Sequence, residues 1–307
     1  MPRRPSPSTR RLRLALTGLV GLALAATGST VLAAPGADDT TTTYEPSVLP
    51  PGDIPPGDGP SCASSVPSAS YDILIPVAGV TQRITDVAVD ITLTHGSVGE
   101  VTVQLIAPGG SPKHVVFGDT GRTAGVLCGE DSNLGGAYSF SDLATTSWWP
   151  TAEATAPNSA IPAGAYRTSE PGSAAVTTGV DTLMTPVFDH LRFGGNGTWK
   201  LRVTDRLFAD SGTVTDAALR LTVDATAPDT SFTSGPADGA RLAAPPTYGL
   251  GSAAYDLAGF RCAIDGSAPA ACPASFTPTV EPGPHTVEVV AIDTSDNLDA
   301  TPVTRSF

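Results

Sequence analysis

Apolar and polar residues alternate in short runs through most of the chain after about residue 61. The clearest runs are VAVDITL at 87–93, VTVQL at 101–105, TWKLRVT at 198–204 and ALRLTV at 218–223. In the first run every second residue from Val87 to Leu93 is apolar, whereas Asp90 and Thr92 face the other way. A period of two with charges on one face indicates half-buried antiparallel strands, and closely spaced turn residues favour a sandwich. Because no stretch carries a convincing apolar stripe of helical period, we expect an all-β protein.

Two changes of composition divide the chain. Residues 34–60 are rich in proline, glycine, threonine and aspartate, which predicts a disordered spacer because so little of this segment can be buried. At 224–230 the last alternating run of the first group ends in "DATAPDT", which predicts a domain boundary. We therefore expect one domain over 61–225 and a second over 226–307, the latter long enough for one small sandwich.

The first 33 residues have the pattern of a secretory signal peptide. Five arginines form a basic head, an apolar stretch runs from Leu14 to Leu32, and Val31-Leu32-Ala33 supplies small residues at cleavage spacing. A membrane anchor is the competing interpretation, but no basic stop-transfer run follows the apolar stretch. The segment predicts a secreted protein, exported by the general or the twin-arginine route.

Charge narrows the set of partners. Without the five arginines of the signal segment, 12 basic residues remain against 30 acidic ones, a net charge of −18. Such a charge repels phosphate backbones and anionic lipids, so we expect no nucleic-acid partner. No other run is long and apolar enough to span a membrane. The acidity suits a soluble protein and is compatible with calcium binding.

Four cysteines, Cys62, Cys128, Cys262 and Cys272, follow the signal segment. An even number in an oxidising compartment indicates two disulfides, and zinc binding is the weaker alternative because no C-x-x-C pattern is present. Cys262 and Cys272 flank Asp265-Gly266, a strong hairpin-turn signal, so we expect a stapled hairpin. By elimination Cys62 pairs with Cys128, with pairing between the two domains as the alternative.

The stretch from about Tyr71 to Val223 resembles the P domain, also called Homo B, of proprotein convertases such as furin and kexin. The resemblance is carried by "ITDVAVDITLTHGSVGEVTVQLIAPGGS", "FSDLA" at 140–144, "IPAGAYRTSEP", and "GGNGTWKLRVTDRLFADSGTVTDAALRLTV". In that family proline is commoner near the position of Thr168. The resemblance implies a jelly-roll β-sandwich of the galactose-binding-like kind, in a module that accompanies a subtilisin-like protease domain.

The last 80 or so residues look like an immunoglobulin-like repeat of secreted bacterial proteins. "TAPDTSFTSGPADG", "FRCAIDGSAPAAC" and "GPHTVEVVAIDTSDNLDATPVTRSF" carry this likeness. It implies a small immunoglobulin-like β-sandwich that acts as a spacer or an adhesive module.

The stretch "THGSVGE" at 94–100 places His95 two residues before Ser97, which raises the question of a serine hydrolase. A subtilisin-like site needs separate Asp, His-Gly-Thr and Gly-Thr-Ser segments, and the chain contains neither Gly-Thr-Ser nor the Gly-x-Ser-x-Gly elbow. We therefore predict no catalytic residues, and a turn of a hairpin in which His95 packs or caps. His114, His190 and His285 are too scattered for a metal site and are expected to be structural or solvated.

Two further groups are candidates for binding. Adjacent Trp148 and Trp149 are a possible stacking platform for sugar or peptide, although we favour one ring in the core and the other over a loop. Glu100, Asp205 and Asp210 are candidate calcium ligands, with solvated carboxylates at strand ends as the favoured alternative, because calcium needs several converging oxygens.

Three functions are compatible with these features. The preferred one is a secreted non-enzymatic protein whose P-like module binds or stabilises a partner. The second is an accessory or remnant of subtilisin-like proteolysis, in which the partner is a separately encoded protease. The third is carbohydrate or cell-surface adhesion through the loop of Trp148 and Trp149.

Overall fold

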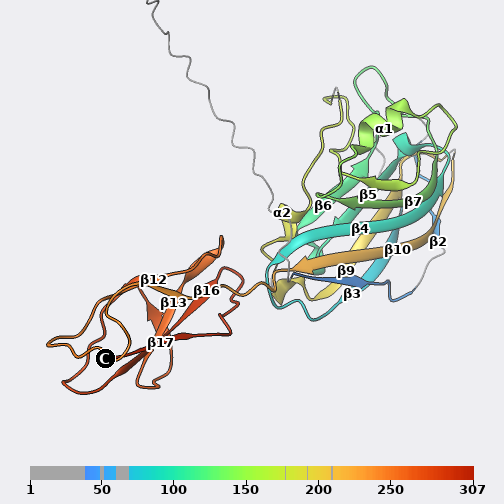
Figure 1. Ribbon diagram of the computed structural model, residues 1–307. Coiled ribbons are helices and arrows are strands. Elements are labelled where there is room, and N and C mark those ends of the chain that lie inside the picture. The colour runs from blue at the N-terminus through green and yellow to red at the C-terminus, as the bar shows by residue number, and fades with distance from the viewer. Residues whose placement is uncertain (1–38, 49–51, 60–68, 177, 192, 209) are drawn as a thin grey trace, which may run out of the picture. The chain divides into compact units, whose positions relative to one another are not determined.

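The protein is nearly all β (Figure 1). The computed structural model describes residues 39–48, 52–59, 69–176, 178–191, 193–208 and 210–307. The predicted signal peptide and Cys62 lie outside these residues. The described helices are short, α1 (Trp148–Ala154) and α2 (Thr185–Phe188), together with the 3-10 turns η1 (Val98–Glu100), η2 (Pro108–Gly110) and η3 (Phe193–Gly195). The all-β expectation is therefore confirmed. None of the helices in the described part of the chain is long and apolar enough to cross a membrane.

Two sheets build the larger domain. The six-stranded sheet contains β1 (Thr40–Tyr44), β2 (Gly52–Ile54), β4 (Ile84–His95), β7 (Leu134–Ser141), β8 (Gly164–Tyr166) and β10 (Gly212–Val223), in the order β1-β10-β4-β7-β8 with β2 also on β10. The four-stranded sheet contains β3 (Ser70–Val77), β5 (Val101–Ile106), β6 (Lys113–Gly118) and β9 (Gly197–Asp205), in the order β3-β9-β5-β6. Neighbouring strands are antiparallel, except that β7 and β8 are parallel.

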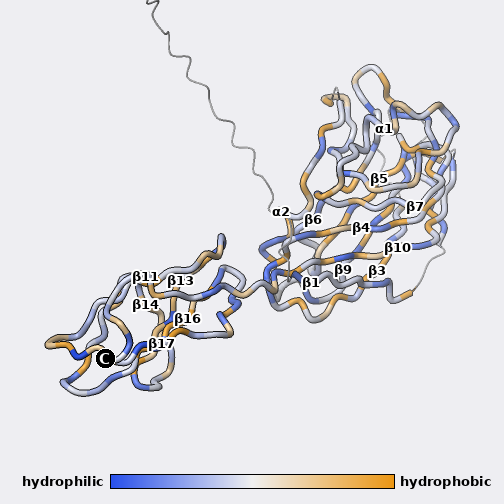
Figure 2. Tube along the Cα trace, in the orientation of Figure 1, coloured by the Kyte–Doolittle hydropathy of each residue, from blue (hydrophilic) through white to orange (hydrophobic). Residues whose placement is uncertain are grey.

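The predicted alternation places one face of each sheet in a shared core. Every second residue of β4 from Val87 to Leu93 is at most 2% exposed, and the apolar residues of β5 and β9 pack into the same cluster. Figure 2 shows the alternating hydropathy along β4 and β10. On the outer face Arg220 binds Asp90 of the neighbouring strand at 2.7 Å. Opposite charges on adjacent strands therefore occupy the solvent side, as the pattern predicts.

The segment predicted as a disordered spacer contributes two strands instead. β1 pairs with β10 from Thr40↔Val223 to Tyr44↔Leu219, and β2 pairs with the other end of β10. The threonines of β1 are exposed, whereas Ile54 of β2 is only 2% exposed. Threonine is β-branched and suits an extended edge strand, which is held by backbone hydrogen bonds and needs little burial. Composition indicates only how much of a segment can be buried, so it does not reveal a strand that is held by backbone pairing.

"THGSVGE" does not close a hairpin, contrary to expectation. β4 belongs to the six-stranded sheet and β5 to the four-stranded sheet, so the segment carries the chain from one sheet to the other. The turn η1 lies within this crossing, and Val98 and Gly99 are buried there. Local sequence cannot distinguish a hairpin from such a crossing, because both join two alternating runs by a short polar segment.

The smaller domain also has two sheets. One contains β11 (Ser231–Ser234), β12 (Tyr248–Gly251) and β15 (Ser275–Phe276), and the other contains β13 (Leu257–Ile264), β14 (Ala270–Cys272), β16 (Thr286–Asp293) and β17 (Val303–Ser306). Its core is a separate cluster centred on Tyr248, Phe260, Val287 and Val289. This cluster is much smaller than the core of the larger domain, which makes covalent support valuable.

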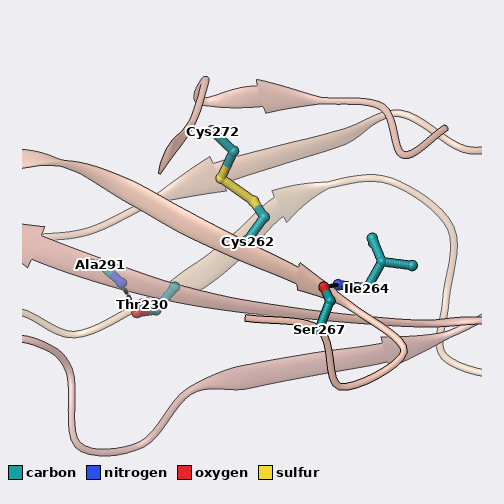
Figure 3. The surroundings of a disulfide bond; sticks show 6 residues. All are labelled: Thr230, Cys262, Ile264, Ser267, Cys272 and Ala291. Atoms are coloured by element: carbon teal, nitrogen blue, oxygen red, sulfur yellow. Dashed lines mark hydrogen bonds between the residues drawn. A yellow bond between two sulfur atoms is a disulfide. The ribbon is translucent and has the colours of Figure 1, made fainter. Parts of the chain in front are cut away.

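A disulfide staples the hairpin of β13 and β14, as the sequence predicted (Figure 3). The Cα atoms of Cys262 and Cys272 lie 5.8 Å apart, and the turn between the strands has Asp265 and Gly266 at positive φ. Such a pair is typical of the tight turns that match the twist of a hairpin. Cys128 is also disulfide-bonded, whereas its predicted partner, Cys62, lies outside the described residues.

Candidate functional site

The three predicted calcium ligands lie among chain segments that meet at one end of the larger sandwich. Glu100 ends η1, Asp205 ends β9, and Asp210 precedes β10, whose first residue, Gly212, pairs with His95 at the end of β4. Gly96 allows this approach, because a Cβ atom built on it would lie 3.0 Å from the carboxyl carbon of Asp210. Residues far apart in sequence therefore surround the "THGSVGE" crossing.

His95 and Asp205 form a buried pair. Nε2 of His95 lies 3.3 Å from Oδ2 of Asp205, and both side chains are fully buried. Nδ1 of His95 lies 2.9 Å from the backbone oxygen of Ser97. Burial alone would lower the pKa of His95, but the hydrogen bond and charge of Asp205 outweigh it and raise the pKa. The ring therefore connects the end of β9 to the crossing.

Ser97 is not arranged as a nucleophile beside His95. Its hydroxyl donates to the backbone oxygen of Glu130 at 3.3 Å, while its backbone amide lies 3.2 Å from Nδ1 of His95. A nucleophilic serine would instead place its hydroxyl on the base. The two residues thus stabilise a turn, in agreement with the role that the sequence predicted for His95.

Glu100 is a buried carboxyl with an unsatisfied oxygen. It is 7% exposed, and within the described part of the chain its Oε2 has no hydrogen-bond partner. Burial, followed by the negative charges of Asp210 and Asp205, raises the pKa of Glu100 to about 7. The nearby Arg206 opposes this shift only weakly, because its guanidinium bonds Asp119 at 2.9 Å and donates to the backbone oxygen of Gly99 at 3.2 Å.

The sequence does not reveal a second acidic group, formed by Asp224, Asp256 and Asp293. Asp224, Asp256 and Asp293 each place a carboxylate oxygen within 4.8 Å of the other two, and among the described residues no other such group of three is found. Asp224 accepts a hydrogen bond from Ser295 at 2.6 Å, and Asp293 accepts one from the backbone amide of Asn297 at 2.8 Å. Burial and the proximity of Asp224 raise the pKa of Asp256. The only sequence signal was the acid-rich "DATAPDT" and "IDTSDN", whose proximity depends on the fold.

The two adjacent tryptophans are buried, so neither presents a stacking platform. Trp148 is 0% exposed and packs against Phe117 with ring centres 4.7 Å apart. Trp149 is 1% exposed, and its ring leaves no space for a side chain at Gly179. The favoured expectation, one ring in the core and one against a loop, describes this arrangement. The adhesion hypothesis loses the residues on which it rested.

The remaining histidines are dispersed, as expected. Nε2 of His114 lies 3.2 Å from the hydroxyl of Thr168, and burial lowers the pKa of His114. The side chain of His190 is 62% exposed. His285 bonds Asp265 at 2.7 Å and borders a hollow of the smaller domain formed by residues 239–245 and 280–285. None of these three belongs to the acidic groups described above.

Comparison with known proteins adds little to this description. No protein-family model matches the chain, and no curated protein matches its sequence. Among solved structures, the glycoside hydrolase domain of Endo-D from Streptococcus pneumoniae R6 is 12% identical with a TM-score of 0.20, over 88% of this chain and 37% of that chain. A β-1,2-glucanase from Parabacteroides distasonis is 10% identical with a TM-score of 0.20, over 87% of this chain and 36% of that one. The chain thus spans well under half of either protein, and similarity this weak carries no argument about fold or activity.

Proposed function

We propose that this chain is a secreted, non-catalytic protein whose larger domain is a P-like module that binds and stabilises a partner. The proposal rests on the contacts made by residues of the P-domain-like motifs. His95 and Asp205 pair across the end of the sandwich, and the carboxylate of Asp142 accepts the backbone amides of Met184 and Thr185 at 2.7 and 2.8 Å. The residues behind the P-domain resemblance therefore hold the sandwich together and form no nucleophile–base pair.

The partner that this resemblance favours is a separately encoded subtilisin-like protease. A module that accompanies such a protease needs a rigid fold and an accessible surface, and it needs no reactive groups of its own. The net charge of −18 expected after signal cleavage favours a partner with a basic surface, because opposite fields accelerate association. The smaller domain then serves as a spacer or adhesive module, a role that stays at the level of fold analogy.

The first test concerns intrinsic activity. The mature chain, residues 34–307, is treated with a fluorophosphonate probe that labels activated serines, beside its Ser97→Ala variant and a heat-unfolded sample. We expect the same background labelling in all three samples, because the Ser97 hydroxyl is bonded to a backbone oxygen. Labelling of the folded chain that Ser97→Ala abolishes would contradict the proposal.

The second test concerns the partner. Cross-linking in culture medium should capture a subtilisin-like protease, whose activity at elevated temperature is then followed with and without the mature chain. We expect the half-life of the protease to lengthen with the mature chain and to stay unchanged with an unrelated acidic sandwich protein. Capture of cell-wall glycan, or no change in half-life, would refute the accessory role.

A further inference from the structure

Three aspartates converge where the segment that follows β10 meets the smaller domain. Each of Asp224, Asp256 and Asp293 places a carboxylate oxygen within 4.8 Å of the other two. Any two oxygens bound to one calcium ion must lie within about 5 Å, twice the calcium–oxygen distance, so all three can reach the same ion. We propose that these three aspartates bind a divalent cation, and that the ion is calcium. The inference does not depend on the partner proposed above.

Strand pairing explains why the three aspartates meet. Asp256 immediately precedes β13 and Asp293 ends β16, and these neighbouring antiparallel strands pair Leu257 with Asp293. Asp224 follows β10, and its Oδ2 accepts a hydrogen bond at 2.6 Å from the hydroxyl of Ser295, in the turn after β16. Backbone pairing and a direct contact therefore hold the three carboxylates at one place in the fold.

No cationic side chain neutralises the charge of this group. Within the described part of the chain, none of the three carboxylates forms an ion pair. Asp224 is 2% exposed and Asp293 is 1% exposed, so solvent screens their charges poorly. Ionised carboxylates that are buried this close together repel one another, and a bound cation removes that cost.

One carboxylate oxygen of the group has no partner. Oδ2 of Asp256 is buried and, among the described residues, accepts no hydrogen bond, although Asp256 as a whole is partly exposed. Buried polar atoms are nearly always bonded, so an unpartnered oxygen beside two further carboxylates indicates a ligand at this position. The exposed part of Asp256 leaves the group accessible to an ion from solvent.

The other two carboxylates are held in place by neutral donors. Oδ1 of Asp293 accepts the backbone amides of Ser295 and Asn297, each at 2.8 Å, and the side-chain amide of Asn297 donates to Oδ2 at 2.9 Å. Oδ1 of Asp224 accepts the backbone amide of Thr226 at 3.2 Å. Carboxylates that bind metals are commonly hydrogen-bonded as well, because each oxygen has more than one lone pair. These bonds therefore orient the carboxylates and leave them able to bind a cation.

The donor set favours calcium over the other common ions. It consists of carboxylates and contains no histidine or cysteine, the side chains that zinc prefers. Calcium takes six to eight oxygens with flexible geometry, so water and backbone carbonyls can complete its shell around three carboxylates. Magnesium demands nearly ideal octahedral geometry, which suits carboxylates already fixed by hydrogen bonds less well.

The experiment measures calcium binding and thermal unfolding of the mature chain, residues 34–307. After metal is removed with EDTA, isothermal titration with calcium chloride should show one-to-one binding with a dissociation constant of about 10⁻³ M or below. Millimolar calcium should raise the melting temperature of the smaller domain by several degrees relative to EDTA, because only the folded state brings the three carboxylates together. Magnesium at the same concentration should have a smaller effect.

Two variants and a control locate the ion. Asp256→Asn should weaken calcium binding at least about tenfold and, in EDTA, should melt no lower than the wild type, because it relieves the repulsion within the group. If this variant fails to fold, Asp224→Asn should show the same loss, since its side-chain oxygen can still accept the bond from Ser295. Glu288→Gln, at a partly buried position of β16 outside the group, is the matched control and should respond like the wild type.

Three results would overturn the proposal. The first is a wild-type chain that shows neither a calcium heat nor a change of melting temperature on chelation. The second is a response to calcium that survives undiminished in both Asp256→Asn and Asp224→Asn. The third is a smaller domain that calcium leaves unchanged and that mildly acidic pH stabilises, which would show that Asp256 and Asp224 share a proton in place of a cation.

Discussion

Individual polar side chains of the larger sandwich act through contacts that join distant parts of the chain. Asp142 follows β7 and accepts backbone amides at the start of α2, and the indole of Trp148 donates to the hydroxyl of Thr120 at 3.1 Å. His114 on β6 faces the hydroxyls of Thr168 and Thr182, each 3.2 Å from Nε2. Buried polar groups of this kind must be hydrogen-bonded, so each one fixes a loop against a sheet.

His114 predicts a loss of stability in mild acid. Burial lowers its pKa, and the charge of Asp142 only partly opposes this. At His114 the unfolded chain therefore binds a proton at a higher pH than the folded chain does, so the contribution of this residue to stability falls as the pH drops below about 6.5, the ordinary histidine pKa. We expect His114→Gln to show a shallower fall in melting temperature between neutral and mildly acidic pH. His190→Gln, at a side chain that is 62% exposed, should match the wild type.

At the scale of elements, β10 organises the larger domain. It pairs with β4 along one side, and with β1 and β2 at opposite ends of the other side. The exposed threonines of β1 bury little, so backbone hydrogen bonds and the partly buried Tyr44 hold this strand. A short polar edge strand of this kind covers the hydrogen-bonding groups of β10, which would otherwise be open to pairing with another chain.

Hydrogen exchange distinguishes an edge strand from a spacer. We expect alternate backbone amides between Thr40 and Tyr44 to exchange slowly in the mature chain, because they pair with residues 219–223 of β10. Removal of residues 34–46 should expose the amides on the outer side of β10 and leave those that face β4 protected. Fast exchange throughout residues 40–44 would restore the spacer interpretation.

At the scale of the whole molecule, the chain has two separate hydrophobic cores. The larger core contains Trp148 and Trp199, and Trp149 is buried in the same domain. The smaller core has seven buried members and is stapled by Cys262–Cys272. Domains with their own cores unfold as separate cooperative units unless a large apolar interface joins them.

Calorimetry of the mature chain should therefore show two transitions. Replacing Cys262 and Cys272 by serine should lower the melting temperature of one transition only. The expected loss in the free energy of unfolding is about 2–3 kcal/mol, because the disulfide no longer restricts the unfolded chain by closing this short loop. Tryptophan fluorescence should follow the other transition, unchanged in temperature, because all three tryptophans of the chain lie in the larger domain. A single transition that moves as a whole would show that the two cores unfold together.

Much of the architecture was predictable because it depends on local periodicity. The buried faces of β4, β5 and β9, the outward position of Arg220 and the stapled hairpin of Cys262 and Cys272 all follow from residues within about ten positions of one another. The two expectations that were wrong both concern which strands pair with one another. The strand nature of residues 40–44 depends on a free edge of β10, and the crossing at "THGSVGE" depends on which sheet each strand joins.

The candidate site was likewise predictable only in part. The sequence by itself determined the all-β class, the stapled hairpin and the acidic residues Glu100, Asp205 and Asp210, because strand period, turn residues and charge are local properties. Only the tertiary structure decided that Trp148 and Trp149 are buried, that the carboxyl of Glu100 is buried, and that Asp224 lies beside Asp256 and Asp293. Burial and the meeting of charges depend on which distant strands pack together, and no window of sequence contains that information.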